Sequence, residues 1–270
     1  LLLPLIGKYY SGEFPDITNA YAWFTDKLQI VGPNAAPYTM PHLLDIDKDF
    51  ESLVNSTIPE MGTGMSGLKV LVKEIDEDSI DVGSRFASAI ADAKQDPGVP
   101  QLVLDNLTGE VLNVVYENDK LYLKTLMSIH IDTCGETVET PLTIESDGTP
   151  RIIEYMPLLY AVTRHDAVYI VDEVERSIHP ILIKDIINKL SKSTDTKGQL
   201  IFTTHESALL DQDIFRPDEI WFAQKDTDQA TQLYPLSDFN IHKTANIENG
   251  YLNGRYGGIP FLSNLKDLHW

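Results

Sequence analysis

The 270-residue sequence is 43% hydrophobic and 23% charged, which excludes a disordered chain and allows one or two domains with a sizeable core. Its 21 basic and 41 acidic residues give a net charge of −20, which argues against a broad surface for nucleic acid or for an anionic membrane. A single cysteine, Cys134, excludes an internal disulfide, and no apolar run is long enough for a membrane span, so we expect a cytoplasmic protein.

Residues 1–66 have helical patterning, and we expect a helical insertion region there. Apolar side chains at helix spacing predict a helix over Asp16–Lys27, and Asp47–Val54 predicts a short amphipathic helical turn. The stretch Gly62–Gly67 formally matches the dinucleotide-binding fingerprint. It leads into a strand-like run instead of opening a helix, so we interpret it as a flexible turn before a strand.

Residues 67–143 have a strand-like texture, and we expect a strand-rich arm. A strand is predicted at Leu68–Val72 and a helix at Ser84–Lys94. Alternation of apolar and polar residues over Gly109–Tyr116 and Lys120–Leu126 predicts a β-hairpin.

Residues 144–270 alternate between helix and strand patterns. The predicted helices are Arg151–Arg164 and Pro180–Leu190, and the predicted apolar strands are Ala167–Val171 and Gln199–Thr203. This order predicts an α/β fold with a parallel-strand core, and strands of this apolar type predict helices on both faces of the sheet. Two further strands are predicted at Glu219–Ala223 and Gln232–Leu236.

Polar side chains follow both apolar strands. Asp172 and Glu173 come directly after the first strand, where open parallel sheets place ligands. Asp172 suits a magnesium ion that also contacts phosphate oxygens, and Glu173 could polarise a water for attack on a phosphoryl group. His205 follows the second strand, and we expect it near the two acids because parallel strands end at one edge. Taken alone, the two acids are explained almost equally well as incidental acids in a solvated turn. A lone histidine at the end of a strand is more often a packed or capping residue than a catalyst.

A third element precedes the predicted helix Arg151–Arg164. Asp147 or Thr149 can cap this helix, and Pro150 fits its first turn. Together with Gly148 and Arg151, the exposed amides make an anion-binding helix start. By itself, this element is also explained as an ordinary capped helix.

In this order and at these intervals, the three elements resemble the nucleotide-binding heads of the ABC, SMC and RecF superfamily of P-loop ATPases. More narrowly, they resemble the ABC-type AAA ATPases of bacterial abortive-infection and phage-defence systems. The stretches that carry this resemblance run from Ile144 to Pro260 and are Glu145–Thr149, Asp172–Pro180, Gln199–His205 and Tyr251–Pro260.

The resemblance implies a role for each matching residue. Ser146 and Gly148 would form the signature motif, which contacts the γ-phosphate held by a second protomer. Asp172 would be the Walker B magnesium residue and Glu173 the catalytic carboxylate. Arg176 and Ser177 would lie in the D-loop at the dimer interface. His205 would be the switch histidine, which senses the γ-phosphate.

The resemblance also implies the cofactors ATP and Mg²⁺ and a dimer that closes around nucleotide. The head would control an effector, such as a Toprim-type nuclease, in defence against phage. No Gly-x-x-x-x-Gly-Lys-Ser/Thr sequence occurs in these residues, so we expect the phosphate-binding loop in an upstream or separate segment. Neither a membrane partner nor a broad nucleic-acid surface is expected.

Two alternatives stay open at this point. One is an oligomeric scaffold that sequesters a toxic partner with little turnover. The other is a magnesium-dependent nuclease, because potential metal ligands are dense between His165 and His179, although their spacing does not match a known zinc motif.

Overall fold

A computed structural model of the protein describes residues 2–10, 12–32, 40–76, 85–105, 110–146, 148–242 and 245–259. The chain forms two compact units, of which the first comprises Leu1–Ile178 and Asp195–Phe202 and the second comprises His179–Thr194 and Thr203–Trp270. The predicted α/β class is confirmed, because parallel and antiparallel strands occur together with helices. The division into residues 1–66, 67–143 and 144–270 stays a prediction. Among the described residues, no helix has both the length and the apolar composition that a membrane crossing requires.

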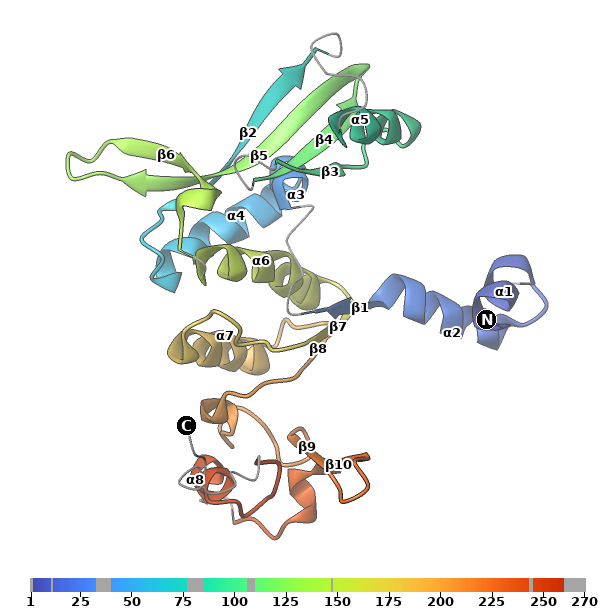
Figure 1. Cartoon of the computed structure of the whole chain (residues 1–270), viewed down its shortest axis with the longest axis vertical. Helices are drawn as coiled ribbons and strands as arrows, with labels where there is room; N and C mark the ends of the chain where they lie inside the picture. Colours follow the sequence, from blue (N-terminus) through green and yellow to red (C-terminus); the bar gives the residue numbers. More distant parts are fainter. Residues whose placement is uncertain are drawn as a thin grey trace, which may run out of the picture. The chain divides into compact units, whose positions relative to one another are not determined.

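A three-stranded parallel sheet lies in the first unit, in the order β1 (Leu28–Val31), β7 (Val168–Val171) and β8 (Gln199–Phe202) (Figure 1). The two strands β7 and β8 confirm the predicted parallel core. The strand β1 lies in the stretch for which only helices are predicted. Its four residues are too few to show a strand period, and pairing with β7 decides their conformation.

One helix, α6 (Gly148–Arg164), packs against β7 and confirms the helix predicted over Arg151–Arg164. The strand register aligns Ile30, Ile170 and Ile201 in one row across the sheet. Within this row, Ile30 is 73% exposed and Ile201 is 45% exposed. No helix of the described part of the first unit therefore covers these two isoleucines, and a second helix layer on this face stays a prediction.

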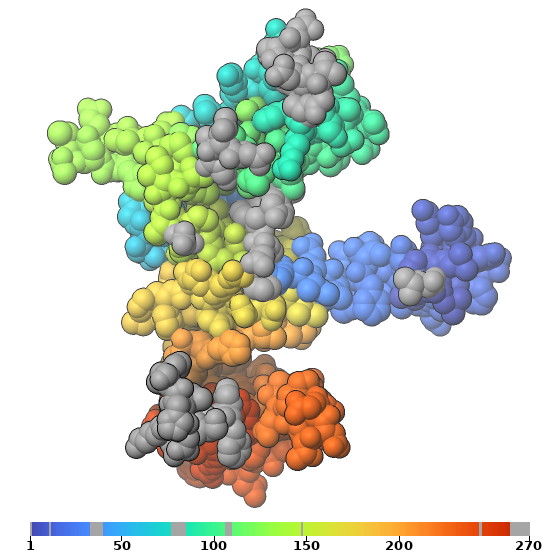
Figure 2. All heavy atoms as spheres, in the orientation of Figure 1, coloured from blue at the N-terminus to red at the C-terminus, as the bar shows by residue number. Residues whose placement is uncertain are grey.

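An antiparallel sheet forms the strand-rich arm of the first unit, in the order β2-β5-β4-β3, and β6 also pairs with β5. Its strands are β2 (Gly67–Ile75), β3 (Gln101–Leu104), β4 (Val111–Glu117), β5 (Lys120–Ile131) and β6 (Thr137–Pro141). The predicted hairpin is confirmed as β4 and β5, with Asn118 and Asp119 in left-handed conformation at the turn. The far end of β5 and the strand β6 form a finger that extends beyond the rest of this sheet (Figures 1 and 2).

The helix α5 (Arg85–Gln95) covers part of the antiparallel sheet and confirms the helix predicted there. Ala89, Ile90 and Ala93 on the helix form a buried cluster with residues of β3, β4 and β5. This cluster gives the arm a hydrophobic core of its own.

The glycine stretch before β2 is a turn. Gly62 has a φ of 68° and ends a short 3-10 helix, Gly64 has a φ of 77°, and β2 begins at Gly67. Because these glycines do not open a helix, the interpretation as a turn before a strand is confirmed.

The described residues before the arm include the α-helices α1 (Leu2–Tyr9), α2 (Pro15–Ala22), α3 (Met40–Ile46) and α4 (Lys48–Thr57). The helix predicted over Asp16–Lys27 corresponds to α2 and the π-helical turn Trp23–Lys27 that follows it. The helical turn predicted over Asp47–Val54 lies in α4, with Asp47 as its N-cap.

The side chain of Asp47 caps α4 and also contacts α6. Its Oδ1 accepts hydrogen bonds of 3.0 Å from the N–H groups of Asp49 and Phe50, and its Oδ2 accepts one of 3.0 Å from the hydroxyl of Tyr160. The hydrogen bond from Phe50 is the main reason that the pKa of Asp47 lies below its ordinary value. This carboxylate therefore joins two helices that are distant in the sequence.

We expect Asp47→Ala to lower the free energy of unfolding by about 1–2 kcal/mol, because it removes a helix cap. Asp49→Ala is the matched control, since Asp49 is an exposed acid in the same turn whose side chain caps nothing. Denaturant unfolding of both variants checks this. A lowered pKa in the folded state means that the contribution of Asp47 is present at neutral pH and is lost as the pH falls through that pKa. Equal losses in the two variants would contradict the assignment.

The second unit contains α7 (Pro180–Lys192), α8 (Ile247–Leu252) and a hairpin of β9 (Trp221–Lys225) and β10 (Thr231–Pro235). These elements confirm the predicted helix over Pro180–Leu190 and the last two predicted strands. The core of this unit is formed by Ile220, Phe222, Leu236, Ile247 and Tyr256.

Candidate functional site

The two apolar strands of the parallel sheet end side by side. Val171 of β7 is paired with Phe202 of β8, so both strand tips open on one edge, as predicted for the carboxyl ends. On the other side of β7, the N–H of Asp172 donates to the carbonyl of Val31 at 2.9 Å and so continues the pairing with β1. At this edge Asp172 is exposed and Glu173 is half-buried.

The loop from Asp172 to Ile178, which we call the acidic loop, holds two residues in an unusual backbone conformation. Glu173 has a φ of 52° and Ser177 a φ of 59°, in the left-handed region that favours glycine. Such residues cost about 1–3 kcal/mol each and persist only where the surroundings hold them. Buried Val174 and Ile178 anchor the loop, and strain of this kind is typical of functional sites.

The helix α6 supports the acidic loop from within the same unit. The buried hydroxyl of Tyr155 donates a 2.9 Å hydrogen bond to the carbonyl of Val174. At the start of α6, a Cβ on Gly148 would lie 2.9 Å from the carbonyl oxygen of Ser177, so glycine allows this close approach. The structure thus brings together two of the predicted site residues, Gly148 and Ser177.

Ser146 lies just before α6 and is exposed. Its carbonyl accepts a 2.9 Å hydrogen bond from the N–H of Thr149, and the two side-chain hydroxyls are 3.3 Å apart. Because the first amides of an α-helix have no partner within the helix, an accessible hydroxyl at this point can join them in contacting an anion. Asp147, the other predicted cap, lies outside the described residues.

Arg151 and Glu154 of α6 interact electrostatically with Arg176 of the acidic loop. Arg151 is only 6% exposed, and its Nη1 donates to Glu154 Oε2 at 2.6 Å. Burial raises the pKa of Glu154, whereas the charges of Arg151 and Arg176 act in the opposite direction. Arg176, a predicted interface residue at an exposed position, is therefore electrostatically linked to α6. Glu154 and Tyr155 were not found by sequence reasoning, and their only signal is the helical spacing from Arg151.

The segment before α6 is held by the antiparallel sheet. Glu145 Oε1 accepts hydrogen bonds of 2.7 Å from Ser128 Oγ and lies 2.7 Å from His130 Nε2, both on β5. Ser128 is fully buried and also contacts Thr140 on β6. These contacts fix the point from which Ser146 and α6 start, a role for β5 that the strand pattern alone does not indicate.

His205, the predicted switch histidine, is an exposed residue of the second unit, three positions after the end of β8. Around it, Thr204 Oγ1 accepts from the N–H of Glu206 at 2.9 Å, and Glu206 Oε1 accepts from the N–H of Ala208 at 3.0 Å. These hydrogen bonds order the segment around His205. The expected position of His205 beside Asp172 and Glu173 stays a prediction.

Over the described ranges, no group of three or more His, Cys, Asp or Glu side chains is placed to hold a metal ion by itself. Asp172 fits a different arrangement, in which one carboxylate holds Mg²⁺ together with phosphate oxygens. The donor set at the strand edge thus suits a magnesium ion that arrives with its phosphate ligand.

We expect Ser177→Gly to raise the free energy of unfolding by about 0.5–1 kcal/mol, because glycine adopts a positive φ without strain. Ser177→Ala keeps the Cβ and removes only the hydroxyl, so it should not stabilise the protein. Thermal unfolding of the two variants measures the difference. Stabilisation by alanine as large as that by glycine would show that the hydroxyl, and not the backbone, is the source.

Comparison with protein-family models relates this chain to a known family. The model described as AAA domain, putative AbiEii toxin, Type IV TA system matches residues 66–211, which is more than half of the sequence. The matched range includes the start of α6, the acidic loop and His205. A search of curated proteins found no match.

Proposed function

The chain belongs to the family of AAA domains described as putative AbiEii toxin, Type IV TA system, and from this membership we propose that it binds and hydrolyses ATP between two protomers. The family is one of AAA/ABC-type P-loop ATPases related to abortive infection. We further propose that the nucleotide state of the dimer controls a partner effector in anti-phage defence.

The observation that carries this proposal is the acidic loop. Its carboxylates follow β7 at the edge where β8 also ends, and the loop is held by Tyr155 of α6. The left-handed backbone at Glu173 places a sharp turn directly after Asp172. We assign two different tasks on one phosphate chain to these two adjacent acids.

In this mechanism, Asp172 holds the magnesium ion and Glu173 acts on water. Magnesium, when bound, neutralises charge on the phosphates. Glu173, which is half-buried, orients the attacking water and accepts its proton on a carboxylate oxygen. The bond from the water oxygen to the γ-phosphorus forms as the bond from that phosphorus to the β–γ bridging oxygen breaks, and ADP leaves with the electron pair.

Across the interface, Ser146 and the amides at the start of α6 contact the γ-phosphate held by the second protomer. Exposure of Ser146 supports this role, because a group that serves a neighbouring molecule must reach the surface. Gly148 allows the start of α6 to lie against the carbonyl of Ser177 in the acidic loop. Arg176 and Ser177 lie on that loop at the same interface, and His205 senses the γ-phosphate.

The phosphate-binding loop required for ATP binding is not among these 270 residues. We propose that a segment outside them supplies it. The partner in defence is proposed to be a nuclease of Toprim type, and the family description supports a toxin–antitoxin context for such a partner. Hydrolysis would release or rearrange the ATP-bound dimer and so change the state of the partner.

ATP turnover and ATP-dependent dimerisation by the natural protein, with its phosphate-binding loop, test the proposal. We expect Ser146→Arg to fold and to bind nucleotide in each protomer but to dimerise poorly, because a bulky cation replaces a small hydroxyl at the interface. Sedimentation with and without ATP measures the dimer, and Ser191→Arg, an exposed serine on α7, is the control.

An unchanged ATP-dependent dimer in Ser146→Arg would contradict the signature assignment. A dimer that forms normally in the wild type but shows no turnover would contradict hydrolysis and favour the scaffold alternative. Absence of both nucleotide binding and turnover in the wild type would overturn the proposed function as a whole.

A further inference from the structure

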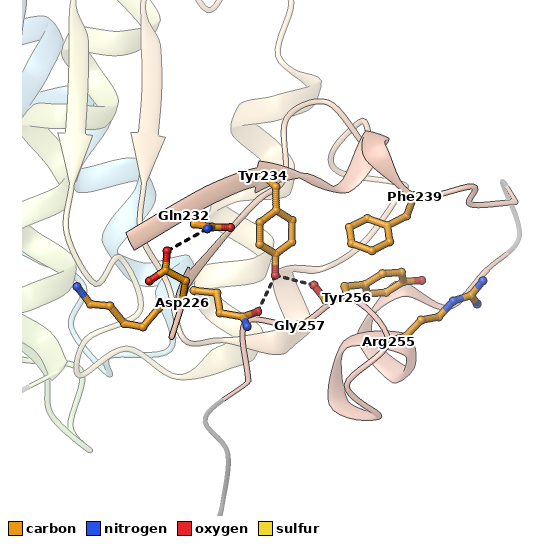
Figure 3. A pocket seen from close by; sticks show the side chains of 9 residues that line it. Asp226, Gln232, Tyr234, Phe239, Arg255, Tyr256 and Gly257 are labelled. Carbon is orange, nitrogen blue, oxygen red and sulfur yellow. Dashed lines mark hydrogen bonds between the residues drawn. The ribbon is translucent and has the colours of Figure 1, made fainter. Parts of the chain in front are cut away.

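A pocket of about 310 Å³ lies in the second unit, between the β9–β10 hairpin and the chain that follows α8 (Figure 3). This size is at the lower end of the roughly 300–1,000 Å³ found for ligand pockets. None of its residues belongs to α6 or to the acidic loop, so the proposed ATPase function does not use it. It is lined by Gln224, Lys225, Asp226, Gln232, Tyr234, Phe239, Arg255, Tyr256 and Gly257.

Hydrogen bonds fix the two walls of this pocket to each other. The hydroxyl of Tyr234 donates to the carbonyl of Tyr256 at 2.8 Å, and the N–H of Gly258 donates to Gln224 Oε1 at 3.1 Å. Gly257 has a φ of 71°, and a Cβ there would lie 2.4 Å from Gln224 Oε1. The wall after α8 therefore requires glycine, and the pocket is formed before any ligand binds.

Some hydrogen-bonding atoms of the polar side chains in this pocket are available to a ligand. Gln224 Oε1 accepts from the N–H of Gly258 and also lies 3.1 Å from the hydroxyl of Tyr234, and its amide N–H groups make no hydrogen bond to a described residue. Gln232 Nε2 donates to Asp226 Oδ2 at 3.0 Å, and the Oε1 of Gln232 accepts no hydrogen bond from the part of the chain that the structure describes. One donor and one acceptor on neighbouring side chains match the edge of a heterocyclic base.

Aromatic and cationic groups complete the lining. The rings of Tyr234 and Phe239 have centroids 6.1 Å apart and offer a face for stacking. Figure 3 shows Asp226 and Gln232 on one side of Tyr234, and Arg255 on the other. Arg255 is exposed and lies over the ring of Tyr256 at 5.7 Å, and it makes no ion pair within the described residues. A guanidinium that no described carboxylate neutralises is notable in a chain with a net charge of −20.

We propose that this pocket binds a purine mononucleotide. The base would stack on Tyr234 with its edge at Gln224 and Gln232, and the phosphate would lie at Arg255. Guanidinium groups suit phosphate because their fork of donors matches its oxygens. A free nucleotide fits better than a nucleic-acid strand, because the strongly acidic chain repels a polyanion.

Calorimetric titration of the protein with AMP, adenosine and inorganic phosphate tests the proposal. We expect AMP to bind the wild type, and Arg255→Gln to weaken AMP at least tenfold while adenosine affinity changes little. Gln232→Leu should weaken AMP and adenosine alike, because both ligands carry the base. Lys189→Gln removes an exposed charge from α7 in the same unit and should change neither affinity.

Asp172→Asn separates this site from the proposed ATPase site, because it should leave AMP binding unchanged even where ATP turnover is lost. No binding of AMP to the wild type, or an equal effect of Arg255→Gln and Lys189→Gln, would overturn the proposal. Phosphate binding as tight as that of AMP, or a short oligoadenylate preferred over AMP, would also overturn it.

Discussion

Glu173→Gln is expected to lower the rate of ATP hydrolysis by roughly 10²–10⁴-fold, the range that loss of a general base produces. The substitution keeps the size and the backbone of the residue, including its positive φ, but the amide cannot accept the proton of the attacking water. Nucleotide binding does not require this proton transfer. The ATP-bound dimer should therefore accumulate, and steady-state turnover together with sedimentation in ATP measures both effects.

Glu175→Gln is the matched control, because Glu175 is another half-buried acid of the acidic loop whose φ is not positive. It changes the charge of the loop equally and should reduce turnover far less. If the two variants hydrolyse ATP at equal rates, Glu173 is not the base. Loss of the dimer in Glu173→Gln would instead indicate that the carboxylate supports assembly.

The parallel core could be predicted from sequence because its strands are short apolar runs that end abruptly in polar residues. Val168–Val171 is followed by two acids, and Gln199–Phe202 by two threonines and a histidine, so both the strands and their functional ends are visible. The strand β1 has no such signal. Its pairing with β7 across more than a hundred residues determines its conformation, and local pattern cannot encode this.

Within the candidate site, the residue types could be predicted from the sequence, but the backbone conformation and the hydrogen bonds that hold these residues could not. The acids, the glycine and the serine stand out by their chemistry and order in the sequence. The left-handed backbone of Glu173 has no signal in the residue type, since glutamate rarely adopts it. The hydrogen bond from Tyr155 to the carbonyl of Val174 depends on how α6 packs against the acidic loop. From sequence alone, a tyrosine within an amphipathic helix is interpreted as a core residue. Sequence therefore indicates candidate groups for the site, whereas tertiary packing decides how they are held.

A buried lysine in the arm is another residue whose structural role the sequence does not indicate. Its substitution is expected to have a large effect on the free energy of unfolding. The side chain of Lys124 on β5 is 1% exposed, and its Nζ lies 2.8 Å from Asp45 Oδ2 and 3.2 Å from Glu117 Oε1. It is also 3.2 Å from Nδ1 of His42. The partners lie on α3 and β4, so one ammonium group connects the helix α3 to the sheet. In the sequence it is an ordinary lysine of an alternating strand.

We expect Lys124→Ala to lower the free energy of unfolding by about 3 kcal/mol, because it leaves two carboxylates without their counter-charge and opens a cavity. Its partners keep 34% and 29% of their side chains exposed, so water offsets part of the loss. Lys120→Ala is the control on the same strand, since Lys120 pairs with Glu74 at 2.9 Å at an exposed site. Exposed pairs contribute at most about 1 kcal/mol. Denaturant unfolding of both variants measures the difference.

The pH dependence of the free energy of unfolding gives a second measurement of the interactions of Lys124. The pKa of His42 is lowered, first by burial and second by the charge of Lys124. The unfolded chain therefore binds a proton at His42 more readily than the folded chain, so stability should fall as the pH drops below about 6.5, the ordinary value. Removing Lys124 removes one cause of this shift, and the slope between pH 7 and pH 5 should become shallower. Equal losses in the two lysine variants, with unchanged slopes, would show that Lys124 does not join α3 to the sheet.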